Sequence, residues 1–176
     1  MHLARRAWCR TYQTVFRIAL PILPYTEPRI LEHAEDVPAV LQKRSIQKVL
    51  IVTDPGIARL GLTASLERAL TAQGIGVTVY AETRANPTVS NVEEAASLYR
   101  ESACQAIIGF GGGSAMDCAK GVGARIAQPN KPINKMRGLL RVHRLLPLLI
   151  AVPTTAGTGS EVTLAAVITD DETHYK

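Results

Sequence analysis

The chain has 176 residues, a length that suits one domain, and its 47% apolar and 20% charged residues exclude an intrinsically disordered protein. The net charge of +5 comes from two segments without acidic residues: residues 1–26 hold four Arg, and residues 118–160 hold seven Lys and Arg. The remainder is acidic, with nine basic against fifteen acidic residues, which argues against a nucleic-acid-binding protein.

Residues 1–25 are expected to form a basic N-terminal extension to a domain at residues 26–176. The apolar stretch 15–24 follows several Arg, as in a signal peptide, but Arg17 and two prolines interrupt it and no small-residue cleavage site follows. An amphipathic extension and a peripheral membrane or lid segment both remain open. No apolar run approaches the ~18 residues of a transmembrane span. Three cysteines without CxxC spacing indicate a reducing compartment, so we expect a cytoplasmic protein.

From residue 46 onward, apolar runs rich in β-branched residues alternate with helical patterns. Strands are expected at residues 48–52, 77–80, 106–110 and 148–152, and the continuous apolar run of the first suits burial on both faces. This alternation predicts an α/β fold with an open, doubly wound, Rossmann-like and mostly parallel sheet. Such sheets bind ligands beyond the carboxyl ends of their strands.

The helices are expected between these strands. Thr63 would cap a helix that ends at Gly74, and a capping box of Ser90 and Glu93 would open the next. A third helix is expected from Ser114 to about residue 127. Residues 128–147, with three prolines and five basic residues, are expected to be an exposed connection.

The sequence GGGSAMD at residues 111–117 follows a predicted buried strand and opens a helix. Three glycines let a diphosphate approach the backbone amides, and the helix N-terminus attracts anions. Ser114 could cap the helix or bond a phosphate oxygen, and Asp117 could hold the loop. A tight turn without a ligand is the alternative. The motif is neither a Rossmann fingerprint, because Met116 stands at its third position, nor a P-loop, because Gly121 follows the lysine.

Two further groups of polar residues follow predicted strands. The loop PTTAGTGSE at residues 153–161 is rich in hydroxyl groups and would lie near the glycine loop. Asp54 ends the first strand, where a carboxylate can accept both hydroxyls of an adenine ribose and repel the 2′-phosphate of NADP. Asp54 could equally be a turn residue before Pro55, and Asn86 carries the same ambiguity.

GGGSAMDCAK followed by PTTAGTGSEVT, with VTD upstream and ITDDE downstream, resembles the iron-containing (group III) alcohol dehydrogenases from about Tyr25 to the last residue. The resemblance implies that this α/β domain binds NAD. Ala165 and Ala166 depart from the polar or aromatic pair of several relatives. The cofactor-binding residues that the resemblance and the motif imply are Gly112, Gly113 and Ser114 on the pyrophosphate, Asp117 holding their loop, Asp54 on the adenine ribose, Asn86, Thr154, Thr155 and Thr158 along the cofactor, and Lys176 near the nicotinamide ribose.

In the family, an all-helical C-terminal domain holds a divalent metal, Fe²⁺ or Zn²⁺, that polarises an alcohol while hydride passes to NAD. The resemblance implies that this chain ends before that domain, so we expect no catalytic residue and no metal ligand in it. Asp170 and His174 have the spacing of a metal pair but match a turn segment of the family. The chain is therefore expected to be the NAD-binding half of a metal-dependent alcohol dehydrogenase acting on a small alcohol or aldehyde, inactive alone and homo-oligomeric.

Two alternatives remain. The chain could belong to an enzyme that resembles glycerol dehydrogenase or dehydroquinate synthase, whose phosphate loops are similar. It could also be a stand-alone nucleotide-binding module.

Overall fold

A computed structural model of the protein describes residues 10–11, 13–14, 28–138 and 141–173. The chain divides into two compact units, Met1–Ile30 and Leu31–Lys176. In the first unit the described residues 10–11 and 13–14 are helical, and the Thr14 hydroxyl donates to the Arg10 carbonyl at 2.9 Å. The apolar stretch 15–24 lies outside the described residues, so the predicted boundary after residue 25 stays a prediction.

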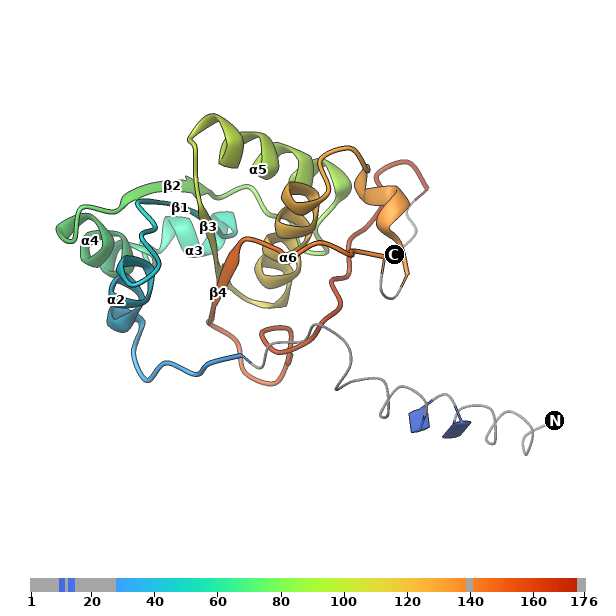
Figure 1. Ribbon diagram of the computed structural model, residues 1–176, viewed down its shortest axis with the longest axis horizontal. Helices are drawn as coiled ribbons and strands as arrows, with labels where there is room; N and C mark the ends of the chain where they lie inside the picture. The colour runs from blue at the N-terminus through green and yellow to red at the C-terminus, as the bar shows by residue number, and fades with distance from the viewer. Residues whose placement is uncertain (1–9, 12, 15–27, 139–140, 174–176) are drawn as a thin grey trace. The chain divides into compact units, whose positions relative to one another are not determined.

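The second unit is built on a four-stranded parallel sheet (Figure 1). Its strands lie in the order β2-β1-β3-β4. In the register, Ile51 lies opposite Val79 on one side and opposite Ile108 on the other. The strand bounds are β1 Lys48–Val52, β2 Gly76–Tyr80, β3 Ala106–Gly111 and β4 Leu148–Pro153. The predicted α/β fold with a parallel sheet is confirmed.

Helices cover both faces of this sheet (Figure 1). Val49 and Ile51 pack with α2 and α4 on one face, whereas Leu50 and Val52 pack with α5, α6 and η3 on the other. Successive strand residues point to opposite faces, which explains why the central strands β1 and β3 are apolar at nearly every position. The helices are η2 Ala34–Asp36, α2 Val37–Gln42, α3 Pro55–Arg59, α4 Ala64–Ala72, α5 Val89–Glu101, α6 Gly113–Ala127 and the 3₁₀ turn η3 Ile133–Met136.

The start of α5 differs from the prediction. Thr88, not Ser90, is the N-cap: its hydroxyl accepts the Asn91 amide N–H at 3.3 Å, and the Asn91 side chain accepts the Thr88 amide N–H at 3.3 Å. The amide of Ser90 donates instead to Oδ2 of Asp171 at 2.9 Å. The capping box of Ser90 and Glu93 was therefore wrong by two residues, because two overlapping sets of suitable residue types compete here.

Two further local predictions were incomplete. Thr63 is the N-cap of α4, but its side chain makes no capping hydrogen bond. Residues 128–147 contain η3, in which Ile133 and Met136 are buried, so the prediction of an exposed connection was wrong for these two. No helix in the described ranges is long and apolar enough to cross a membrane.

Candidate functional site

The candidate site lies at the carboxyl ends of β1, β3 and β4. Gly111 at the end of β3 lies opposite Pro153 at the end of β4, and the Thr154 amide donates to the Gly111 carbonyl at 2.9 Å. The glycine loop and the hydroxyl-rich loop therefore leave the sheet side by side. This is the arrangement expected for a ligand site in an open α/β sheet.

The glycine loop turns directly into the N-terminus of the 15-residue helix α6. Gly111 has φ +142°, a region that favours glycine, and Gly112 is the N-cap with φ −83°. Glycine offers no side chain to cap α6. The first amides of the helix and the positive end of its dipole are therefore suited to an anion. Ser114 does not cap the helix; its Oγ accepts the amide N–H of Asn86 at 3.3 Å.

The hydroxyl-rich loop lies over this helix N-terminus. A Cβ on Gly112 would stand 3.4 Å from Oγ1 of Thr155. A Cβ on Gly113 would stand 3.1 Å from Oγ of Ser160 and 3.7 Å from Cβ of Thr158. The structure thus brings together the glycines and threonines that the sequence predicted, and adds Ser160, which the prediction omitted although it lies in the same motif.

Asp54 connects the end of β1 to both α3 and the glycine loop. Its Oδ1 accepts the amides of Gly56 at 2.8 Å and Ile57 at 3.0 Å, which makes it the N-cap of α3. Its Oδ2 lies 3.3 Å from the position of a Cβ on Gly111. Asp54 therefore has a capping role, as the turn-residue alternative required, and Oδ2 is the atom left for other partners.

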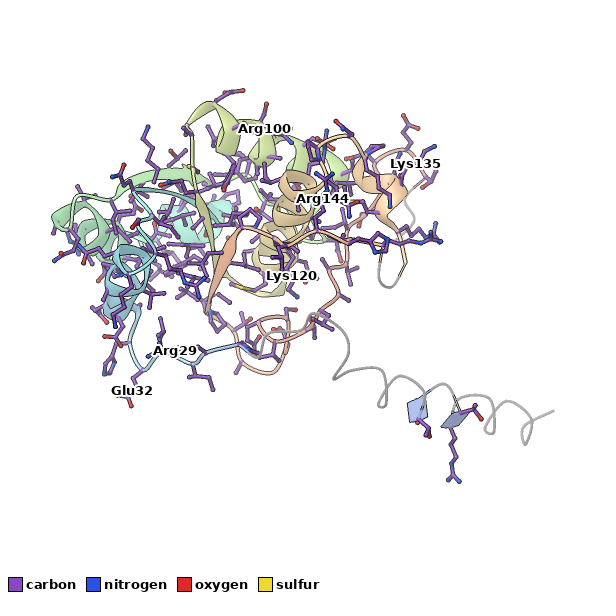
Figure 2. The ribbon with its side chains drawn as sticks, in the orientation of Figure 1. Arg29, Glu32, Arg100, Lys120, Lys135 and Arg144 are labelled. Atoms are coloured by element: carbon purple, nitrogen blue, oxygen red, sulfur yellow. The ribbon has the colours of Figure 1, made fainter. Side chains whose placement is uncertain are left out.

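Asp117 was predicted with the cofactor residues, but its hydrogen bonds go to Lys120 and to the backbone of Val167. Its Oδ2 accepts the Val167 amide at 3.1 Å, and its Oδ1 lies 3.4 Å from Nζ of Lys120. Lys120 extends from α6 (Figure 2) and donates to Oγ1 of Thr163 and to the Ala165 carbonyl, each at 2.8 Å. Burial lowers the pKa of Lys120, and the nearby carboxylates of Asp117 and Glu161 oppose that shift.

A polar network behind the site supports the loop that carries Asn86. The Tyr80 hydroxyl donates to Glu94 at 2.7 Å and accepts from Nδ2 of Asn91 at 3.0 Å. Asn91 also donates to the Glu82 carbonyl at 3.1 Å. Burial, the Glu94 hydrogen bond and the Glu94 charge raise the pKa of Tyr80, so the phenol stays protonated. The sequence offered no signal for this network, because it joins residues of a strand, a loop and a helix.

Two predicted positions, Lys176 and His174, lie outside the described residues. The Oδ1 of Asp170 accepts the amides of Glu172 at 3.0 Å and Thr173 at 2.9 Å, and these bonds lower its pKa. Asp170 is thus a turn residue, as the sequence comparison with the family implied. Among the described residues, no group of three or more His, Cys, Asp or Glu side chains could hold a metal ion.

Known proteins with similar sequences are oxidoreductases. Choline dehydrogenase of Bacillus subtilis is 38% identical over 133 residues, which make up 74% of this chain and 33% of the relative. Alcohol dehydrogenase 4 of Schizosaccharomyces pombe is 38% identical over 136 residues, 77% of this chain and 32% of the relative. The chain therefore spans about a third of the length of these relatives.

Solved structures agree. An alcohol dehydrogenase from Oenococcus oeni has a TM-score of 0.76 and 37% identity, and the match covers 81% of this chain and 38% of that one. Sulfoacetaldehyde reductase from Bifidobacterium kashiwanohense, solved in complex with NAD⁺, has a TM-score of 0.73 and 29% identity over 87% of this chain and 40% of that one. The family model described as "Iron-containing alcohol dehydrogenase" matches residues 30–176. The chain belongs to the iron-containing alcohol dehydrogenase family.

Proposed function

We propose that the α/β unit binds NAD across the N-terminus of α6, as the nucleotide-binding part of an oxidoreductase that moves hydride between an alcohol or aldehyde and NAD(H). One observation carries this proposal: residues 111–113 present a helix N-terminus without a capping side chain, at the carboxyl edge of a parallel sheet, beneath the hydroxyl-rich loop. That combination provides backbone amides, a helix dipole and hydroxyl donors around one space.

Within this proposal each part of the dinucleotide has partners of suitable chemistry. The amides of Gly112 and Gly113, with the Ser114 hydroxyl, would hold the pyrophosphate. Thr155 and Thr158 would donate along the cofactor from the opposite side. The Oδ2 of Asp54 would accept an adenine ribose hydroxyl, since Oδ1 is already used by the amides of α3. A 2′-phosphate would be repelled there, so NAD is favoured over NADP.

The remaining assignments rest on the family alone. Thr154 and Asn86 would lie along the cofactor, and Lys176 would contact the nicotinamide ribose. When bound, the nicotinamide supplies the hydride acceptor or donor of the reaction. The family resemblance also leads us to propose that this chain alone does not oxidise alcohols. A cytoplasmic location is in keeping with Cys104 and Cys118, which are buried and free of disulfides.

Calorimetric titration of the chain with NAD⁺ and NADP⁺ tests the proposal. We expect saturable binding of NAD⁺ with a Kd below about 1 mM, weaker binding of NADP⁺, and weaker NAD⁺ binding by the S114A variant. K135A is a suitable control, because Lys135 lies in η3, away from the loops at the strand ends. Absence of NAD⁺ binding at millimolar concentration would refute the proposal.

A further inference from the structure

Residues 163–167 are hydrogen-bonded to α6 through one ion pair, Asp117 and Lys120. Asp117 and Lys120 lie one turn apart, and their side chains are only 14% and 12% exposed. The lysine binds Thr163 and the Ala165 carbonyl, while the aspartate binds the Val167 amide. Four hydrogen bonds thus join the helix to the segment and the two side chains to each other.

These contacts use the polar atoms of both side chains. A lysine ammonium has three N–H donors, and Lys120 has three acceptors in Asp117, Thr163 and Ala165. Asp117 uses one oxygen for Lys120 and the other for Val167. The hydrogen bonds of both side chains therefore go to each other and to residues 163–167, and not toward a ligand on the glycine loop.

The segment 163–167 continues directly from the hydroxyl-rich loop. Thr163 lies three residues after Ser160, and its hydroxyl has two alternative acceptors, the Ser160 carbonyl at 3.4 Å and the Ala165 carbonyl at 3.2 Å. Between the end of β4 and Thr163, the backbone belongs to no helix or strand, and Gly157 and Gly159 have φ +85° and +65° with open space around them. Regular secondary structure does not hold this loop in place, so its position depends on tertiary contacts, including those that residues 163–167 make with α6.

We propose that Asp117 and Lys120 are positioning residues, which hold residues 163–167 on α6 and thereby set the hydroxyls of Thr158 and Ser160 over the helix N-terminus. The inference rests on the proposed function, because the hydroxyls matter there as partners of the dinucleotide. It assigns Asp117 to the loop instead of the cofactor. It also gives a role to Lys120, which the family resemblance left without one.

The test compares K120M with the wild-type chain in two measurements. Methionine keeps most of the aliphatic side chain but removes the ammonium group. Without nucleotide, we expect hydrogen exchange in residues 158–167 to be about tenfold faster, the equivalent of losing one charge-assisted hydrogen bond, while exchange in the strands is unchanged. In calorimetry, NAD⁺ should bind about tenfold more weakly. K120R, which keeps the charge and the donors, should restore most of both losses.

R125M is the matched control. Arg125 also lies on α6, but its hydrogen bonds go to Glu93 of α5 at 2.7 Å and to the Pro129 carbonyl at 2.6 Å, and not to residues 158–167. It should leave exchange in residues 158–167 and NAD⁺ affinity unchanged. If K120M does not fold, D117N provides the same two readouts, because asparagine keeps an acceptor for Val167 and removes the charge that faces Lys120.

The outcomes separate this inference from the proposed function. Unchanged exchange in residues 158–167 of K120M overturns the positioning role, and so does faster exchange with unchanged NAD⁺ affinity. A wild-type chain that does not bind NAD⁺ overturns the proposed function alone, since the exchange measurement needs no nucleotide. Equal losses in K120M and R125M also overturn the positioning role, because they would report general destabilisation.

Discussion

The Oγ of Ser160 lies 3.1 Å from the point where a Cβ on Gly113 would stand. Contacts of that length are tight, so any side chain at Gly113 must displace the hydroxyl-rich loop or be displaced by it. Gly113 is the first residue of α6, with ordinary helical backbone, so glycine is not required there for backbone conformation. The requirement is space above the helix N-terminus, where the proposed pyrophosphate would bind.

The G113V variant should therefore lose nucleotide affinity more than fold stability. We expect NAD⁺ to bind more than about tenfold more weakly, because the new methyl groups fill the space over the helix amides and push Ser160 away. Calorimetric titration measures this. G76A is the control, since its Cβ meets only the Cγ of Lys48 at 3.3 Å and the Gln47 carbonyl at 3.6 Å, at the start of β2. A folded G113V chain with wild-type affinity would contradict the proposed location of the pyrophosphate.

The packing of α6 on α5 depends on another glycine. A Cβ on Gly121 would stand 2.8 Å from Cγ2 of Val92 and 3.3 Å from Cδ1 of Ile168. Alanine in a helix usually stabilises by up to about 1 kcal/mol relative to glycine, but this overlap should reverse the sign. We expect G121A to lower the free energy of unfolding by about 1–3 kcal/mol, measured by urea denaturation.

A double-mutant cycle checks the cause. V92A removes the methyl groups that the new alanine meets, so G121A should cost less in the V92A background than in the wild type. An equal cost in both backgrounds would mean that the overlap with Val92 is not the reason.

The sheet could be predicted from the sequence almost residue by residue, whereas the start of α5 could not. A continuous apolar run such as residues 49–52 suits burial on both faces, which leaves few alternatives to an interior parallel strand. At α5, Thr88 and Ser90 are both acceptable N-caps. The choice depends on Asp171, which lies 81 residues beyond Ser90 and takes its amide. A local pattern carries no information about such a partner.

The candidate site shows the same division. The glycine loop and the hydroxyl-rich loop were predictable, because each follows a recognisable strand. Glycines at that point let a ligand approach the backbone, and threonines offer it hydroxyl groups. The roles of Asp117 and Lys120 were not, because their partners Thr163 and Val167 lie in a segment without secondary-structure periodicity. Asp54 was the intermediate case, since a carboxylate at that position suits both the capping of α3 and contact with a ribose.

Alkaline pH should destabilise the fold through the buried thiol of Cys118. Burial raises the pKa of Cys118 from 9.0 to about 12, and the charges of Glu94 and Asp117 add to the shift. The unfolded chain loses this proton near pH 9.0 and the folded chain only near pH 12, so the stabilisation is complete below pH 9.0 and is lost as the pH rises toward 12. The free energy of unfolding should fall by up to about 1.4 kcal/mol per pH unit in this window.

Urea denaturation at pH 7, 9 and 10 measures the effect. The series stops at pH 10 because tyrosine, with an ordinary pKa of 10.0, contributes more at higher pH. The C118A variant should show a shallower loss between pH 9 and 10, whatever its stability at neutral pH. C104A is the comparison, because burial also raises the pKa of Cys104 and its own contribution can be subtracted. Parallel pH curves for the wild type and C118A would refute the assignment.

The outer edge of β4 should make the chain self-associate. Leu149 packs with the core beneath α5 and α6, and Ile150 with the core beneath α2 and α4, so the strand is apolar on both faces like an interior strand. Yet β3 is its only strand partner within the described ranges, and Leu145 just before it is 86% exposed. Two copies can pair such edges antiparallel about a two-fold axis. Light scattering should show a mass above 19.0 kDa that rises with concentration. L145K should weaken association, whereas L60K, at an exposed residue after α3, should not; a monomeric mass at every concentration would disprove it.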